Sequence, residues 1–227
     1  MNKKILLSIV ILILCLGITS IITTFIVKNQ SSDITDLPTL MDASGKIDLE
    51  VGDFNLSYQP YIGDSNAPIK VIEFADFKCP ACRNWDRLYF DSFKEEFIDT
   101  GKVQFYFINF PFLGPDSIEA AVAAEAMYNQ EPGKFWEFKE KLFQKQGEEK
   151  TIWATEKFLL DFVKDNISGV DYNLFESNLK NRKYLFDVKK DFKISAANGI
   201  YGTPSFIVNG EKVGPDKLEN KVNELID

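Results

Sequence analysis

The stretch E-F-A-D-F-K-C-P-A-C, residues 73–82, decides how the rest of this chain is interpreted. It contains the only C-x-x-C pattern of the sequence, and with it two of the three cysteines in 227 residues. An apolar run, Ile69–Phe74, leads into it, and the residues after it carry apolar side chains at helical spacing. We therefore expect two thiols at the junction between a buried strand and a helix.

The flanking residues predict a β-α-β unit. Ile69–Phe74 is expected to be a strand, and apolar residues at steps of three or four from Pro80 to about Phe97 predict a helix. Lys102–Ile108 predicts a second central strand. With a connection of this length, the two strands are expected to be parallel and the crossover right-handed.

A helical block and a second small unit of strands follow. The block is predicted to contain helices at residues 118–128 (capped by Asp116 or Ser117), 133–146 and 155–166, and two more within 171–198 that meet near Asn181. After it we expect strands at 206–208 and 212–213, joined by the turn Asn209-Gly210, and a last helix from Pro215 to Ile226. The predicted fold class is thus α/β with a helical insertion.

The N-terminus predicts a membrane anchor over residues 1–28. Ile5–Val27 carries no charge and, as a helix, is long enough to span a bilayer. Lys3 and Lys4 before it favour a cytoplasmic N-terminus, which places the rest outside the cytoplasm, where disulfides persist. A cleaved signal peptide is the alternative. Cys15 follows a bulky leucine, so it is interpreted as an apolar membrane residue and not as a lipoprotein cysteine.

Residues 29–57 lack a sustained pattern and are predicted to be a linker, with Ile47, Leu49 and Val51 alternating like a short strand.

Composition excludes several classes of function. The chain has 34 acidic and 26 basic side chains, which argues against nucleic acid as a partner. The absence of histidine excludes Ser-His-Asp and Cys-His catalysis as well as histidine metal sites.

A redox function is the interpretation of Cys79-Pro80-Ala81-Cys82 that survives these exclusions. A structural zinc site needs four ligands, and the chain offers one cysteine pair with no histidine, so no metal site is predicted. A structural disulfide across so short a loop would add little stability. We expect Cys79 at the helix N-terminus to be an activated thiolate, with Pro80 in the first helical position, and the more buried Cys82 to resolve mixed disulfides.

Two further positions are interpreted together with the dithiol. Glu73 is either a solvent-facing charge on its strand or, as we favour, a buried acid that relays the proton of Cys82. Lys78 either adds to thiolate stability or is solvated. Thr203-Pro204 is predicted to be a cis peptide bond in a loop beside Cys79, which leaves the Thr203 backbone free to pair with a substrate peptide. Ala81 and Pro80 are expected to border the same substrate.

These motifs resemble those of the DsbA family. The resemblance rests on four segments in order and runs from about Gln59 to the C-terminus: E-F-A-D-F-K-C-P-A-C (73–82), A-A-E-A (123–126), G-K-F-W-E (133–137) and G-T-P-S-F (202–206). More narrowly, the chain is similar to the membrane-anchored, BdbD-like oxidases of Gram-positive bacteria. One departure is Ala81, since DsbA itself has a histidine at that position that helps to stabilise the thiolate.

The resemblance implies a thioredoxin-like domain over residues 58–227 with a helical insertion at about 114–198. It implies that Cys79 is the nucleophile, Cys82 the resolving cysteine, Pro204 the cis-proline and Glu73 the buried acid, with the Cys79–Cys82 disulfide in place of an external cofactor. The implied function is disulfide formation in exported proteins, with reoxidation by a quinone-linked, DsbB-like membrane protein. A disulfide reductase or isomerase, or a peptide-binding chaperone module, is the alternative.

Overall fold

The predicted helices and strands of the α/β fold all fall within the part of the chain that the structure describes. The structure, a computed structural model, describes residues 16–18 and 37–226, and residues 38–227 form one compact unit. The predicted membrane segment, residues 5–27, lies outside the described residues except at 16–18. No helix of the described ranges is both long and apolar enough to cross a membrane.

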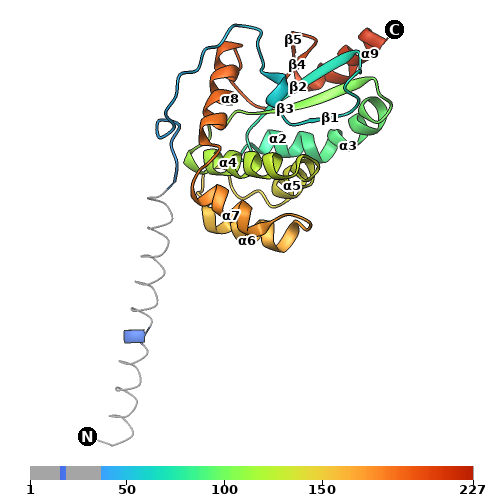
Figure 1. The fold of residues 1–227 in the computed structure, drawn as a ribbon. Helices are drawn as coiled ribbons and strands as arrows, with labels where there is room; N and C mark the ends of the chain where they lie inside the picture. Colours follow the sequence, from blue (N-terminus) through green and yellow to red (C-terminus); the bar gives the residue numbers. More distant parts are fainter. Residues whose placement is uncertain (1–15, 19–36, 227) are drawn as a thin grey trace, which may run out of the picture. The chain divides into compact units, whose positions relative to one another are not determined.

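A five-stranded sheet in the order β1-β3-β2-β4-β5 forms the centre of this unit (Figure 1). Its strands are β1 (Tyr61–Ile62), β2 (Ile69–Ala75), β3 (Val103–Asn109), β4 (Ser205–Val208) and β5 (Glu211–Val213). The predicted parallel pair is confirmed, since β2 runs parallel to β3 in register from Ile69–Val103 to Ala75–Asn109. β4 is antiparallel to β2 and to β5, whereas β1 is an antiparallel edge strand that the sequence did not indicate.

The two central strands are buried on both faces, and alternate side chains point to opposite faces. Val71 packs in the cluster on one face, with α9 (Leu218–Ile226) and the helix that follows the dithiol. Ile72 and Phe74 pack in the cluster on the other face, with α8 (Leu185–Ala197). Glu73 shares the parity of Val71 and therefore points to the face that the dithiol helix covers.

The helix after the dithiol is continuous from Pro80 to Ile98, but not α-helical throughout. Its parts are α2 (Pro80–Trp85), the π-helical η2 (Asp86–Phe90), α3 (Asp91–Phe93) and the π-helical η3 (Lys94–Ile98). Trp85 and Phe90 both face the sheet although they are five residues apart, because a π turn adds one residue to the helical repeat. Tyr89, which an uninterrupted α-helical spacing places inside, is consequently exposed.

The helical block packs against one end of the sheet, and Figure 1 shows α4 and α5 between the sheet and the outer pair α6 and α7. Its helices are α4 (Pro115–Gln130), α5 (Pro132–Gln144), α6 (Glu156–Asn166), α7 (Tyr172–Lys180) and α8. The predicted capping of α4 by Asp116 or Ser117 is wrong: the helix starts at Pro115 after Gly114. Both side chains are buried in its first turn, where they bond to neighbouring loops.

Residues 38–58, called the strap below, lie along the face of the sheet that α8 covers. The predicted strand at residues 47–51 does not form, because the backbone there makes no sheet ladder among the described residues. Two tertiary hydrogen bonds fasten the strap instead: Lys189 Nζ donates to the Ala43 carbonyl at 2.5 Å, and the Gly52 amide donates to Asn198 Oδ1 at 2.7 Å. Apolar side chains of the strap complete the cluster on this face, namely Leu49, Phe54 and Leu56.

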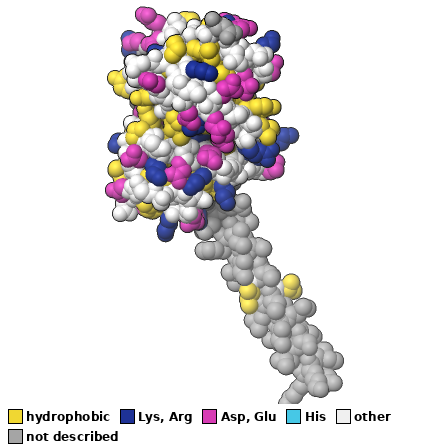
Figure 2. Space-filling view, turned by 90° about the vertical axis from the view of Figure 1, so that its right-hand side faces the viewer, with side chains coloured by type: hydrophobic (Ala, Val, Ile, Leu, Met, Phe, Trp, Pro, Cys, Tyr) yellow, Lys and Arg dark blue, Asp and Glu magenta, His cyan; other side chains and the backbone are white. Residues whose placement is uncertain are grey.

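The surface is polar and mixed in charge. On the face shown in Figure 2, lysine and arginine side chains alternate with aspartate and glutamate, and no broad area of one sign forms. With a net charge of −8 for the chain, this face offers no basic tract for a phosphate backbone.

Candidate redox site

The dithiol lies where the sequence places it, at the carboxyl end of β2. Cys79 is the N-cap of α2, and Pro80 occupies the first helical position, where no amide donor is needed. The Cys79 sulfur accepts a hydrogen bond from the Cys82 amide at 3.4 Å, so it takes the place of a capping oxygen. Both thiols are free in this structure. The helix N-terminus thus surrounds the Cys79 sulfur with the donors that favour an anion.

A loop 124 residues further along the chain completes the site. The Thr203–Pro204 peptide bond is cis, and the loop precedes β4, the antiparallel neighbour of β2. The Cys79 thiol donates a hydrogen bond to the Thr203 carbonyl at 3.3 Å. The buried Thr203 hydroxyl has no hydrogen-bond partner among the described residues. The sheet therefore brings Cys79, Thr203 and Pro204 together, as the sequence interpretation placed them.

The surroundings of Cys79 lower its pKa to about 6. The largest cause is a hydrogen bond from the Cys82 thiol. The Thr203 side chain and the amides of Cys82 and Ala81 lower the pKa further, against the opposing effect of burial. A thiol with this pKa is mostly thiolate at neutral pH, and the thiolate is the nucleophile in disulfide exchange.

The pKa of Cys82 is shifted in the opposite direction from that of Cys79. Its side chain is fully buried, and burial raises its pKa well above the ordinary thiol range. The hydrogen bond that it gives to Cys79 and the charges of Cys79 and Glu73 raise the pKa further. The sulfur therefore holds its proton whenever the pair is reduced, and it needs a proton when the disulfide opens.

Glu73 lies below the dithiol as a buried carboxyl group, which excludes the solvent-facing alternative. Its exposed fraction is 0%, and neither carboxyl oxygen has a hydrogen-bond partner in the described part of the chain. Burial raises its pKa to about 8; Lys139 lowers it, and Asp86 and Cys79 raise it. Glu73 is consequently protonated at neutral pH and can donate a proton close to Cys82.

Lys78 takes neither of the roles considered for it. It is buried, and its ammonium group binds Asp116 Oδ1 at 2.7 Å and the Thr151 carbonyl at 2.9 Å. Asp76, two residues earlier, accepts hydrogen bonds from the Phe112 amide at 2.9 Å and the Ser117 hydroxyl. Both side chains therefore fasten the first turn of α4 and its preceding loop to the segment that carries the dithiol.

Gln146, just after α5, is a site residue that the sequence did not indicate. Its Nε2 donates to the Phe77 carbonyl at 2.7 Å and to the Cys79 carbonyl at 3.1 Å. No local pattern announces such a contact, because it depends on how the insertion packs on the sheet. Asp76 was similarly missed, although its place within the 73–82 stretch was a usable signal.

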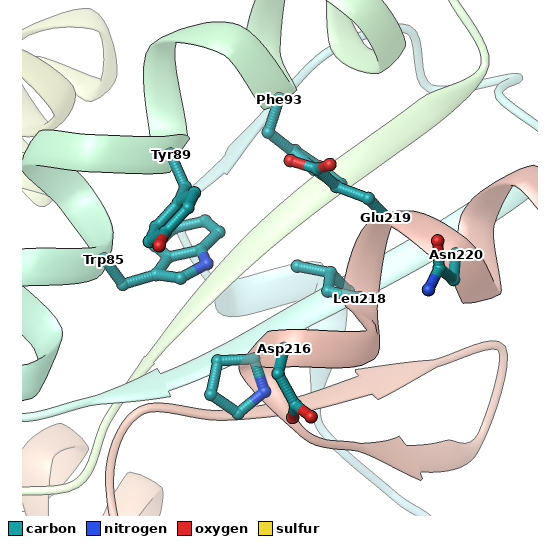
Figure 3. Close-up of a pocket in the computed structure, with 8 residues that line it drawn as sticks. Trp85, Tyr89, Phe93, Asp216, Leu218, Glu219 and Asn220 are labelled. Carbon is teal, nitrogen blue, oxygen red and sulfur yellow. The ribbon is translucent and has the colours of Figure 1, made fainter.

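The outer rim of the site is formed by Pro80, which is half-buried, and Ala81, which is exposed. Further along the dithiol helix, a cavity of about 460 Å³ lies between that helix and the start of α9. Figure 3 shows Trp85 and Tyr89 on one side of this cavity, with Leu218 pointing towards them from α9. The cavity combines an apolar floor with a polar edge that includes Asp216 and Glu219. Such a hollow suits an apolar side chain of a polypeptide.

Comparisons with known proteins agree with this geometry. The sequence model of a family described as thioredoxin matches residues 43–227. The "Probable disulfide bond formation protein D" of Bacillus anthracis is 44% identical over 163 residues, which is 72% of this chain and 75% of that protein. The disulfide bond formation protein D of Bacillus subtilis is 32% identical over 176 residues, or 78% of this chain and 79% of that protein. The crystal structure of oxidised BdbD from Bacillus subtilis superimposes with a TM-score of 0.69 at 32% identity and covers 74% of this chain and 93% of that one.

Proposed function

The chain belongs to the DsbA-like proteins of the thioredoxin superfamily, and from this premise we propose that Cys79 and Cys82 exchange a disulfide with exported proteins. It is a protein-disulfide oxidoreductase of the disulfide-forming type. The redox group is the cysteine pair itself. The assignment of individual roles to Cys79, Cys82, Glu73 and the Thr203–Pro204 loop is our proposal.

The proposed reaction has two displacement steps. A substrate thiolate attacks the Cys79 sulfur, the Cys79–Cys82 bond breaks, and Cys82 leaves with the electron pair and takes the proton of Glu73. A second substrate thiolate then attacks the substrate sulfur of the mixed disulfide, and Cys79 leaves as a thiolate. The substrate has lost two electrons and gained a disulfide, and the enzyme holds a Cys79 thiolate, a Cys82 thiol and a Glu73 carboxylate, which takes up a proton again before the next cycle.

The observation that carries this proposal is the asymmetry between the two thiols. Cys79 is a good leaving group, because its pKa is about 6, whereas burial keeps Cys82 protonated. A stabilised Cys79 thiolate stabilises the reduced enzyme, which makes the disulfide form a stronger oxidant. The hydrogen bond from the Cys82 thiol and the nearby Thr203 side chain supply this stabilisation although Ala81 stands where DsbA has a histidine.

The substrate is proposed to lie across Pro80, Ala81 and the Thr203–Pro204 loop. An extended peptide beside Thr203 can pair with the backbone of the loop, in the manner of an added strand. The cavity that Trp85 and Leu218 border is proposed to accept an apolar side chain of the same polypeptide, since reduced, unfolded proteins expose such side chains.

The proposed location is the outer side of the cell membrane, with residues 1–28 as a single-pass anchor and a linker that ends where the globular unit begins at Pro38. The uncharged run Ile5–Val27 after Lys3 and Lys4 supports this arrangement. The proposed reoxidising partner is a quinone-linked, DsbB-like membrane protein, since each turnover leaves two electrons on the cysteine pair. Cell fractionation, together with labelling of Cys79 by a membrane-impermeant thiol reagent on intact cells, tests the location.

The direction of the reaction is tested by the reduction potential. An oxidase of this type is expected near about −120 mV, the value for DsbA, and a reductase near about −270 mV, the value for thioredoxin. Equilibration with glutathione mixtures gives the potential from the ratio of reduced to oxidised protein. A value close to that of thioredoxin would replace the oxidase with the reductase.

The assignment of the two cysteines is tested by trapping in cells. Cys82→Ser is expected to accumulate mixed disulfides between Cys79 and exported proteins, because the resolving thiol is missing. Cys79→Ser is the matched control and is expected to trap none. If neither variant forms mixed disulfides with exported proteins, the chain acts as a binding module and the catalytic assignment is wrong.

A further inference from the structure

Lys139 is a buried cation that no step above uses. It lies on α5 within the stripe Phe135, Phe138, Leu142 and Phe143, which contacts the core of the helical block. Its exposed fraction is 1%, and its ammonium group lies 4.1 Å from the centre of the Phe90 ring and 5.5 Å from that of Phe143. A lysine in the middle of an apolar stripe requires a partner of opposite charge, because burying an unpaired charge costs free energy.

The partner of Lys139 is Asp86, the first residue of η2 on the dithiol helix. The Lys139 Nζ and Asp86 Oδ1 atoms form an ion pair in which both side chains are at most 5% exposed. The pair joins the insertion to the helix that carries Cys82, four residues before Asp86. A buried ion pair contributes little net stability compared with apolar side chains of the same size, so stability alone is a weak reason to retain it.

The pair lies within electrostatic reach of Glu73. The charged or titratable groups that act on the Glu73 carboxyl are Lys139 from α5, Asp86 from η2 and Cys79 from the dithiol, and the Glu73 charge in turn acts on Cys82. The strands beside Glu73 contribute only Phe107 and Phe206 at its level. No hydrogen-bond donor in the described residues reaches the Glu73 oxygens, so burial, and after it charges at a distance, set the balance between its two protonation states.

We propose that the Lys139–Asp86 ion pair is a positioning device for proton transfer, and that its two opposite charges adjust how readily Glu73 gives its proton to Cys82. This inference rests on the proposed relay between Glu73 and Cys82. When Glu73 has given its proton away, its buried carboxylate is stabilised by the Lys139 ammonium. When Glu73 is protonated, the Asp86 carboxylate offsets the ammonium and keeps Glu73 from losing the proton prematurely.

The two members of the pair are therefore expected to act in opposite directions. Loss of the cation in Lys139→Met leaves Asp86 as the nearest charge and strengthens proton binding by Glu73. Loss of the anion in Asp86→Asn leaves the Lys139 ammonium group uncompensated and weakens proton binding by Glu73. Each change is expected to move the titration midpoint of Glu73 by about one pH unit, roughly a tenfold change in proton affinity. A purely structural pair predicts lost stability in both variants and no such opposite shifts.

The experiment titrates Glu73 in the full-length oxidised protein, where neither cysteine titrates. Glutamate labelled with ¹³C at the side-chain carboxyl, with Glu73→Gln to assign the signal, gives the midpoint in each variant. Lys78→Met is the matched control, because the Lys78–Asp116 pair is equally buried but is not among the charges that act most on Glu73. The midpoint is expected to rise in Lys139→Met, to fall in Asp86→Asn and to stay unchanged in the control.

Kinetics provide the second readout. The pH at which the rate of substrate oxidation declines is expected to follow the Glu73 midpoint, upward in Lys139→Met and downward in Asp86→Asn. If Lys139→Met does not fold, Asp86→Asn, which keeps the shape of the side chain, decides the question alone. An unchanged midpoint in a folded Asp86→Asn overturns the inference. That failure is distinct from failure of the proposed function, which appears as absent trapping through Cys79.

Discussion

Cys79 lies at the N-terminus of α2, and Cys82 lies one turn inside it, and this single turn separates their chemistry. The outer sulfur accepts hydrogen bonds from the Cys82 thiol and from backbone amides, while the inner one is enclosed by apolar side chains. The hydrogen bond between the two thiols increases the difference between their pKa values. The proton that Cys82 keeps is the one that stabilises the Cys79 thiolate.

The first prediction concerns the ionisation of Cys79. In the reduced protein, the rate of alkylation by iodoacetamide is expected to rise with pH around a midpoint of about 6, because only the thiolate reacts. Mass spectrometry after brief exposure at each pH identifies the modified cysteine. Cys79→Ser is the control and is expected to show no alkylation in this window. A midpoint near that of an ordinary thiol contradicts the assignment.

The second prediction concerns the Thr203 hydroxyl. Thr203→Val keeps the shape of the side chain but removes a group that lowers the pKa of Cys79, so the pKa is expected to rise. If the thiolate loses about 1.4 kcal/mol of stabilisation, the reduction potential falls by about 30 mV and the protein becomes a weaker oxidant. Equilibration with glutathione measures this change. Thr151→Val, at a residue that is not among the groups that lower the pKa of Cys79, is expected to leave the potential unchanged.

The third prediction concerns Glu73 and the pH dependence of stability. Its pKa is raised from 4.5 to about 8 in the folded protein, so folding takes up a proton between these two values. The free energy of unfolding is therefore highest below about pH 4.5 with respect to this group and decreases as the pH rises to about 8. The total contribution is roughly 2–5 kcal/mol.

Glu73→Gln is expected to remove this slope. Urea unfolding of the oxidised protein between pH 5 and pH 9 gives the free energy at each pH. The difference between wild type and variant isolates Glu73, because other buried carboxyl groups such as Glu125 and Asp191 contribute equally to both. The variant is expected to gain stability relative to wild type as the pH rises. A constant difference across the range would show that Glu73 is ionised in the folded protein.

At the scale of secondary-structure elements, α4 shows how tightly the insertion is joined to the sheet. Five of its alanines are at most 1% exposed, namely Ala120, Ala121, Ala123, Ala124 and Ala126. Small side chains let neighbouring helices approach α4 closely, and its first turn is fastened to the dithiol segment through Asp116 and Ser117. The insertion therefore supports the active site and is not a separate appendage.

The fourth prediction follows from this packing. Ala123→Leu adds three carbon atoms where no space exists and is expected to lower the free energy of unfolding by about 1–3 kcal/mol. Ala196→Leu on the exposed side of α8 introduces the same side chain and serves as the control, with a change near zero. Chemical denaturation of both oxidised proteins provides the comparison. Equal stability of the two variants would mean that α4 has room that the structure does not show.

At the scale of the whole molecule, the strap belongs to the globular unit. It buries Ala43 and lays Phe54 against the sheet, with the Phe54 and Phe74 rings 6.1 Å apart at their centres. The globular unit therefore begins at Pro38, about twenty residues before the predicted boundary at residue 58.

The fifth prediction tests whether the strap is part of the fold. Phe54→Ala is expected to lower the free energy of unfolding by about 1–3 kcal/mol, because apolar area is lost from the cluster on the α8 face. Val51→Ala, at a position 83% exposed, is the control with little effect. The reduction potential is expected to stay the same in both, since neither residue is among the groups that set the pKa of Cys79 or Cys82. Unchanged stability of Phe54→Ala would make residues 38–58 a passive linker.

The sequence by itself determined the features that depend on neighbours along the chain. The apolar run at 69–74, the helical spacing after Pro80 and the position of Cys79 at the helix N-terminus predicted the β-α-β unit and the activated cysteine. Helices α5, α6 and α7 of the insertion also followed from their periodicity, whereas α4, which is buried on all sides from Asp116 to Met127, was indicated by its many alanines. The π-helical turns were not predictable in this way, because they follow from the need to bring Trp85 and Phe90 onto the same face of the sheet.

Only the tertiary structure decided what touches the dithiol from a distance. Gln146 and Lys139 come from the insertion, far in sequence from the dithiol helix, and their contacts arise when the sheet and the insertion close around β2. For Lys139 a signal was present, a lysine within an apolar stripe, but its partner was not. Local patterns encode which face of an element is buried, whereas the environment that sets the acidity of Cys79, Cys82 and Glu73 exists only after distant segments have packed.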